Sequence, residues 1–119
     1  MRERVRVRIE LADVLRRAGK LDMAEPMYEE ARAAVLRAER RLGTAYQPTE
    51  AARWDARIDY RVGLLLKIRG ELAEAIAITE RAIEQATLGG ALEEIPAMCA
   101  LLAFCQRRSK SSARAVATT

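Results

Sequence analysis

The chain has 119 residues, but histidine and asparagine do not occur among them, and aromatic residues make up only 4%. Histidine is the most common general acid–base group and metal ligand in proteins. Its absence excludes serine–histidine–aspartate and cysteine–histidine catalysis. Paired carboxylates exist, as at Glu29 and Glu30, but adjacent side chains on a helix diverge by about 100°. We therefore expect a protein that is not an enzyme and that has no cofactor or metal site.

Only two cysteines are present, Cys99 and Cys105. On a helix they would lie roughly 240° apart, so they point to different faces and cannot easily form a disulfide. We interpret them as two small buried thiols, a usage typical of a reducing compartment. The longest apolar run, residues 97–105, is too short to span a bilayer, and no apolar stretch follows the charged first residues. We therefore expect a cytoplasmic location and no membrane contact.

Proline and glycine are also sparse, at 3 and 6 residues, whereas hydrophobic residues make up 50% of the chain and charged residues 32%. Strands favour aromatic and β-branched residues, while alanine is the best helix former, so the abundant alanines favour closely packed helices. The length corresponds to one domain. The composition therefore predicts a single all-α domain.

A segment near the N-terminus recurs 51 positions later. Five positions are identical at this offset, namely Leu15/Leu66, Gly19/Gly70, Leu21/Leu72, Ala24/Ala75 and Ala31/Ala82. A match at a fixed offset indicates a repeat of paired helices, which builds binding surfaces rather than active sites. Small residues at matched positions let two helices approach closely, and the glycine allows the tight turn between them.

Apolar stripes at helical spacing predict five helices. They form one hairpin, a second hairpin and a single last helix, over residues 3–42, 49–87 and 91–107. We take residues 1–108 as the helical domain. Residues 109–119 are small and polar, so we expect a frayed helix or a flexible tail there.

Two local signals predict how the first hairpin turns. Gly19 is expected to end the first helix in a left-handed conformation. Asp22 is expected to cap the second helix, with Glu25 three residues later as its capping-box partner.

The repeated segments resemble the tetratricopeptide repeat. Leu11–Ala12 and Val62–Gly63 match its Leu-Gly pair, and Tyr28 takes its aromatic position. The offset of 51 exceeds the roughly 34 residues usual in that family, so the two central helices are longer. The resemblance implies antiparallel helical hairpins stacked as a short right-handed α-solenoid of five helices, or of six if residues 109–119 add one.

In this family a ligand usually lies in the groove lined by the first helix of each pair. The matching positions in this chain are Arg6, Ile9, Asp13, Arg16, Arg17, Arg57, Tyr60, Leu64, Lys67 and Ile68. Several are basic, so the resemblance implies a protein or peptide partner of acidic character. Alternatively, the arginines and lysines only solvate the helices.

The resemblance also bears on the biological setting. Family members that grip the terminal carboxylate of a peptide use asparagine, which is absent here. Long, alanine-rich repeats are similar to repeat regions of large bacterial signalling proteins. The resemblance therefore implies a non-catalytic scaffold for protein–protein interaction in a bacterial signalling or regulatory system.

The last predicted helix is apolar on all sides over residues 97–105, and such a helix must be covered on both sides. The preceding helix is expected to cover one side. The other is left for residues 109–119, for a second copy in a homodimer, or for further repeats of a longer array, since three or more repeats are normally needed for stability. For self-association the contacting stripe would be Met98, Leu101, Leu102 and Cys105.

The net charge is +4, and the basic residues gather toward the two ends of the chain. The alternative function is therefore a basic helical protein that binds nucleic acid. It requires the arginines of residues 2–8 to share one surface with Arg107, Arg108 and Lys110. Aromatic stacking platforms are scarce, which argues against binding of single strands. We rank this function below a protein-interaction scaffold.

Overall fold

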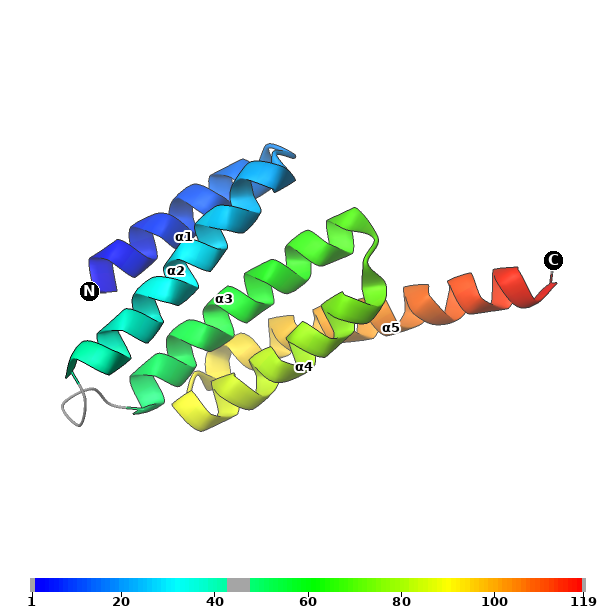
Figure 1. The fold of residues 1–119 in the computed structure, drawn as a ribbon. Helices are drawn as coiled ribbons and strands as arrows, with labels where there is room; N and C mark the ends of the chain where they lie inside the picture. Colours follow the sequence, from blue (N-terminus) through cyan, green and yellow to red (C-terminus); the bar gives the residue numbers. More distant parts are fainter. Residues whose placement is uncertain (1, 43–47, 119) are drawn as a thin grey trace.

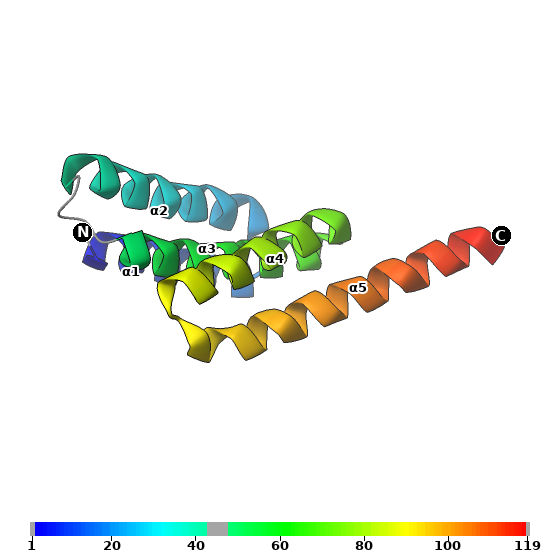
Figure 2. The same cartoon turned by 90° about the horizontal axis from the view of Figure 1, so that it is seen from below.

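The computed structural model describes residues 2–42 and 48–118, and these residues form helices joined by short turns (Figure 1). The elements in chain order are α1 (Arg2–Arg17), α2 (Leu21–Leu42), α3 (Pro48–Arg69), α4 (Leu72–Gly89), the 3₁₀ helix η2 (Leu92–Glu94) and α5 (Ile95–Thr118). α1 and α2 form one antiparallel hairpin, α3 and α4 form a second, and the hairpins stack mainly through α2 and α3. α5 packs on α4 (Figure 2). The predicted all-α stack of helical hairpins is therefore confirmed.

The last helix is longer than the sequence predicted. α5 runs without a break to Thr118, so the expected frayed or flexible tail continues the helix through residue 118. In both views the C-terminal half of α5 projects away from the other helices (Figures 1 and 2). Residues 109–118 therefore do not return over the apolar part of α5. Neither α5 nor any other described helix combines the length and apolarity needed to cross a membrane.

The turns that close the two hairpins have the same geometry. Gly19 and Gly70 adopt φ values of 79° and 81°, a left-handed conformation that glycine tolerates without steric cost. The amides of Lys20 and Glu71 donate to the carbonyl five residues earlier, at 2.9 and 3.0 Å. This bond is the mark of a Schellman turn. The glycine turn predicted for the first hairpin is therefore confirmed, and it recurs in the second.

Small residues let the two helices of each hairpin approach closely. A Cβ atom added to Gly63 of α3 would lie 2.7 Å from Oγ1 of Thr79 on α4, so nothing larger than glycine fits without displacement. The equivalent residue of the first hairpin is Ala12, which is fully buried, as are Ala24 and Ala75 on the facing helices. The predicted contact of small residues is therefore present in both hairpins.

The prediction that Asp22 caps α2 is wrong. The helix begins at Leu21, so Asp22 lies inside its first turn. Asp22 and Glu25 instead form ion pairs with Arg69 at the end of α3, where the Asp22 Oδ1 to Arg69 Nη2 distance is 2.9 Å. The local sequence could not show this, because Arg69 reaches α2 only through the stacking of the two hairpins.

One side of α5 closes the core of the second hairpin. Met98, Leu101 and Cys105 are at most 5% exposed and pack in the core clusters that contain α3 and α4, while Leu102 is half-buried. The stripe assigned to self-association is therefore covered within the chain itself. Burial raises the pKa of the Cys105 thiol. Cys99 was expected to be buried too, but it is exposed, because it lies on the side of α5 that faces away from α4.

Candidate interaction surface

The first helix carries an apolar face that is open to solvent. Val7, Leu11 and Val14 lie on one side of α1 at spacings of four and three, and they are 60%, 47% and 60% exposed. We call these three residues the apolar α1 face. A row of exposed apolar side chains along one helix face is a surface that another protein segment can cover.

The second hairpin provides an internal comparison for this face. The same repeat positions on α3 are almost fully buried, namely Ile58 (0% exposed), Val62 (7%) and Leu65 (0%). Their neighbours show what covers them: Asp59 binds Arg32 of α2, and Arg61 binds Asp13 of α1. This face of α3 is therefore turned toward the first hairpin. The apolar α1 face is turned toward the place where a preceding hairpin would lie.

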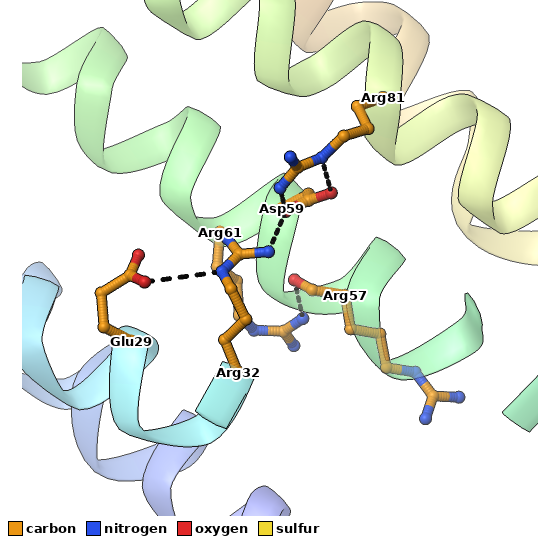
Figure 3. A network of polar contacts seen from close by, with 6 residues as sticks. All are labelled: Glu29, Arg32, Arg57, Asp59, Arg61 and Arg81. Atoms are coloured by element: carbon orange, nitrogen blue, oxygen red, sulfur yellow. Dashed lines mark hydrogen bonds and ion pairs between the residues drawn. The ribbon is translucent and has the colours of Figure 1, made fainter. Parts of the chain in front are cut away.

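A buried carboxylate joins three helices beside the covered face of α3 (Figure 3). Asp59 is 0% exposed, and it accepts two hydrogen bonds from Arg81 of α4 at 2.8 Å and one from Arg32 of α2 at 2.7 Å. Arg32 also pairs with Glu29 of its own helix at 3.6 Å. The bond to Asp59 raises the pKa of Arg81. Because a buried carboxylate is tolerated only when it is paired, this cluster fixes how the second hairpin packs on the first.

A pocket of about 310 Å³ adjoins the Asp59 cluster, with walls from α2, α3 and α4. It is lined by Arg32, Val35, Leu36, Glu39, Asp55, Asp59, Arg81 and Gln85. We call it the three-walled pocket. Burial, followed by the charge of Asp59 and more weakly that of Glu39, raises the pKa of Asp55. Charges of both signs meet here, as in a structural junction between helices.

A larger groove of about 670 Å³ lies between α1 and α2. It is lined by Arg4, Arg8, Ala34, Arg37, Ala38, Arg40 and Arg41, and we call it the arginine groove. Arg8 pairs with Glu30 at 3.7 Å, whereas the other four arginines form no ion pair with any described residue. Five guanidinium groups against one carboxylate make the groove strongly positive, so that it attracts anionic groups.

The arginine groove occupies the same place in the first hairpin as the three-walled pocket occupies beside the second. It has walls from two helices, whereas the pocket has walls from three. Lining residues correspond at the 51-residue offset as Arg4/Asp55, Arg8/Asp59 and Ala34/Gln85. The wall that α2 contributes to the pocket has no equivalent in the groove among the described residues. Val7 follows Arg4 by three residues, and Leu11 follows Arg8 by three, so the apolar α1 face and the arginine groove adjoin.

The ten positions that the family resemblance assigned to a groove are divided between core and surface. On α1, Ile9, Asp13 and Arg16 are buried, at 4% to 9% exposed. Asp13 accepts hydrogen bonds from the Tyr28 hydroxyl at 2.5 Å and from Arg61 at 3.0 Å. Burial and the bond to Asp13 raise the pKa of Tyr28. These residues hold α1, α2 and α3 together.

Several of the remaining positions contact neighbouring helices. Arg57 pairs with Glu94 at 2.9 Å, and the Lys67 ammonium lies 5.0 Å from the centre of the Phe104 ring. Half-buried positions are Tyr60 and Leu64, and exposed positions are Arg6, Arg17 and Ile68. Only part of the set is therefore free to meet a partner.

The two basic ends of the chain do not meet. α1 begins and α5 ends at opposite ends of the molecule (Figure 1), so the arginines of residues 2–8 do not share a surface with Arg107, Arg108 and Lys110. Residues 4–8 instead face residues 34–41 across the first hairpin. Sequence reasoning missed this groove. The antiparallel hairpin was itself the signal, because it places the start of one helix beside the end of the next.

No family model, curated protein or solved structure matches this chain. Its function is therefore inferred from its internal repeat and from the chemistry of its surface.

Proposed function

We propose that this chain is a non-catalytic protein-interaction module of the tetratricopeptide-repeat type, and that it binds a helix of a partner protein on the apolar α1 face. The observation that carries the proposal is the contrast between Leu11 and Val62, which occupy one repeat position and are 47% and 7% exposed. Repeat proteins bury each hairpin against its neighbours, and a terminal repeat normally has a polar outer face. The outer face of α1 is apolar, so it is suited to receive another helix.

The repeat pattern supports the same proposal. Stacked helical hairpins with glycine turns serve mainly as binding surfaces. The expectation from the sequence pattern, that long alanine-rich repeats resemble repeat regions of bacterial signalling proteins, favours a regulatory scaffold that acts through a protein partner. The second hairpin and α5 would then support the first hairpin, because the repeat positions that are open on α1 are covered on α3, where Ile58, Val62 and Leu65 are at most 7% exposed.

Two matched variants test the proposal. Leu11→Glu places a charge in the middle of the apolar α1 face, and Arg6→Glu places the same side chain elsewhere on α1, at a residue of the groove that the resemblance implied. Both residues are exposed, so both variants should fold. We expect the wild-type chain and Arg6→Glu to capture the same protein from the source cells, and Leu11→Glu to lose it.

Light scattering on the purified chains identifies a second copy as the partner if the wild type is dimeric and Leu11→Glu is monomeric. Equal capture by all three chains, or a loss confined to Arg6→Glu, contradicts the assignment to the apolar α1 face. A wild-type chain that is monomeric and captures nothing contradicts the proposed function itself.

A further inference from the structure

We infer that the partner helix is amphipathic with acidic residues along one edge, and that it packs on α1 as α2 packs on α3. This inference rests on the proposed function and adds to it the chemistry of the partner. It follows from the three-walled pocket, where α2 occupies on α3 the position that the partner helix would occupy on α1. The residues that α2 contributes to that pocket therefore indicate what the partner would contribute.

The packing of α2 on α3 defines the apolar part of the partner. Val35 of α2 is 2% exposed and belongs to the same core cluster as Ile58 and Val62 of α3. Leu36 continues this apolar surface into the three-walled pocket. The apolar α1 face occupies the same repeat positions as the covered face of α3. A helix with apolar side chains on consecutive turns would therefore cover it in the same way.

The charges on α1 define the polar edge of the partner. Arg8 occupies the position of Asp59 with the opposite sign, and it pairs with Glu30 of its own hairpin as Asp59 pairs with Arg81. Asp59 also binds Arg32 of the preceding helix, at 2.7 Å. Arg8 carries the opposite charge to Asp59, so the partner residue that takes the place of Arg32 beside it would be acidic.

The rest of the arginine groove adds to this requirement. In the three-walled pocket Glu39 of α2 acts on Asp55 with a like charge that raises its pKa. Arg4 takes the place of Asp55 in the groove, so an acid at the position of Glu39 would there meet an opposite charge. The three arginines of α2 extend the positive wall. Guanidinium groups bind carboxylates through paired hydrogen bonds, so an acidic helix would both close and neutralise the groove.

A nucleic acid would bind the arginine groove but would leave the apolar α1 face uncovered. Phosphates would meet the arginines, but Val7, Leu11 and Val14 would stay exposed beside them. A helix with an apolar stripe next to an acidic edge satisfies both halves at once. For this reason we assign the surface to a protein helix.

The chain itself supplies a matched pair of probes. One is the synthetic peptide of residues 21–42 with Arg32→Glu, and the other is the same peptide with its native Arg32. Packed on α1 as α2 packs on α3, the first peptide sets a carboxylate against Arg8 and the second sets like charges together. In fluorescence anisotropy titrations with the full-length chain, we expect the first peptide to have a Kd roughly tenfold lower than the second.

Charge reversal in the protein should invert this preference. With Arg8→Glu in the full-length chain, we expect the native peptide to bind more tightly than the substituted one. Leu11→Glu should weaken both peptides, and Arg6→Glu should change neither. Equal affinity of the two peptides for the wild-type chain, or no inversion by Arg8→Glu, overturns the inference.

A tandem chain makes the test independent of how well a peptide folds in solution. Residues 21–51, either native or with Arg32→Glu, are joined directly before Met1, because Met1 corresponds to Ala52 at the 51-residue offset. The added helix is then tethered to α1 as α2 is tethered to α3. We expect the tandem with Arg32→Glu to melt roughly 4 °C or more above the native tandem. Equal melting temperatures, or the reverse order, count against an acidic edge.

The outcomes separate this inference from the proposed function. If Leu11→Glu abolishes capture of a natural partner while the two peptides bind equally, the function stands and the acidic edge is wrong. If Leu11→Glu leaves capture intact, the proposed function fails at its own test. If a short DNA duplex binds the wild-type chain more tightly than the acidic peptide, and loses affinity with Arg4→Glu, the surface belongs to nucleic acid and the inference is overturned.

Discussion

Leu11 in the first hairpin and Val62 in the second stand at the same position of the repeat, yet they are 47% and 7% exposed. Their local sequences are alike, with apolar residues at helical spacing followed by the same glycine turn. The difference comes from the neighbouring helix, because α2 covers α3 and no described helix covers the corresponding face of α1. Burial in this molecule is therefore a property of the stack rather than of the single hairpin.

The charged residues repeat this comparison with their signs exchanged. Asp59 is fully buried and binds arginines from two helices, whereas its counterpart Arg8 pairs with a Glu30 side chain that is 60% exposed. Water and salt screen the carboxylate of the pair in the first hairpin, while the Asp59 carboxylate of the second is desolvated, although the Arg81 side chain that binds it is 53% exposed. The same location in the repeat thus serves as a structural junction in one hairpin and is open to a partner in the other.

The largest expected difference between the hairpins comes from one substitution made at both positions. Val62→Glu buries a carboxylate without a partner and should lower the free energy of unfolding by about 3 kcal/mol or more. Leu11→Glu stays in solvent and should change it by no more than about 0.5 kcal/mol. Urea denaturation followed by circular dichroism measures both. Equal losses at the two positions would show that α1 is covered in solution.

Substitutions at Asp59 and at its counterpart Arg8 should also differ in their cost to the free energy of unfolding, by less than Val62→Glu and Leu11→Glu do. Asp59→Asn weakens three charge-assisted hydrogen bonds and should cost about 2 kcal/mol. Arg8→Gln removes one exposed ion pair and should cost less than about 0.5 kcal/mol. Urea denaturation at low and high sodium chloride checks the explanation, since only the contribution of Arg8 should fade with salt. A cost for Arg8→Gln that matches Asp59→Asn would contradict it.

The smallest expected effect is that of Asp55→Asn on the free energy of unfolding, and this effect depends on pH. Its pKa is raised in the folded chain, chiefly by burial and then by Asp59. The folded state therefore favours the protonated carboxyl. The stability that comes from this preference is fully present below the ordinary pKa of an aspartate, about 4. It is lost as pH rises through the raised pKa of Asp55 in the folded chain. Asp55→Asn should leave stability unchanged at low pH and increase it by about 0.5 kcal/mol at neutral pH.

Urea midpoints of the wild type and Asp55→Asn, measured across the acidic and neutral range, test this sign. A variant that loses stability at neutral pH would mean that the charged carboxylate is favoured in the three-walled pocket. Arg4, the counterpart of Asp55, lies in the arginine groove and is exposed. Arg4→Gln should therefore show no such pH dependence, and it serves as the matched control.

Sequence reasoning was reliable where the cause was local. Apolar residues at helical spacing and glycines with no Cβ atom act within one or two turns of chain, so the helices and the Gly19 turn could be predicted. The capping role expected of Asp22 failed because the Lys20 carbonyl already accepts hydrogen bonds from the amides of Met23 and Ala24, so the helix begins before Asp22. The ion pair of Asp22 with the distant Arg69 could not be predicted locally. The arginine groove could have been predicted from the expected hairpin, which sets residues 4–8 beside residues 34–41. Sequence reasoning instead paired the basic N-terminus with the basic C-terminus.

By itself the sequence determined that this protein is a repeat of closely packed helical hairpins, since short side chains and glycine turns leave the chain few other ways to bury its apolar stripes. Only the tertiary structure decided which copy of each stripe is covered. Ile58, Val62 and Leu65 lie beneath the first hairpin, whereas Val7, Leu11 and Val14 meet solvent. The physical reason is that burial and desolvation depend on what lies across from a helix face, and a repeated sequence presents the same face wherever it occurs.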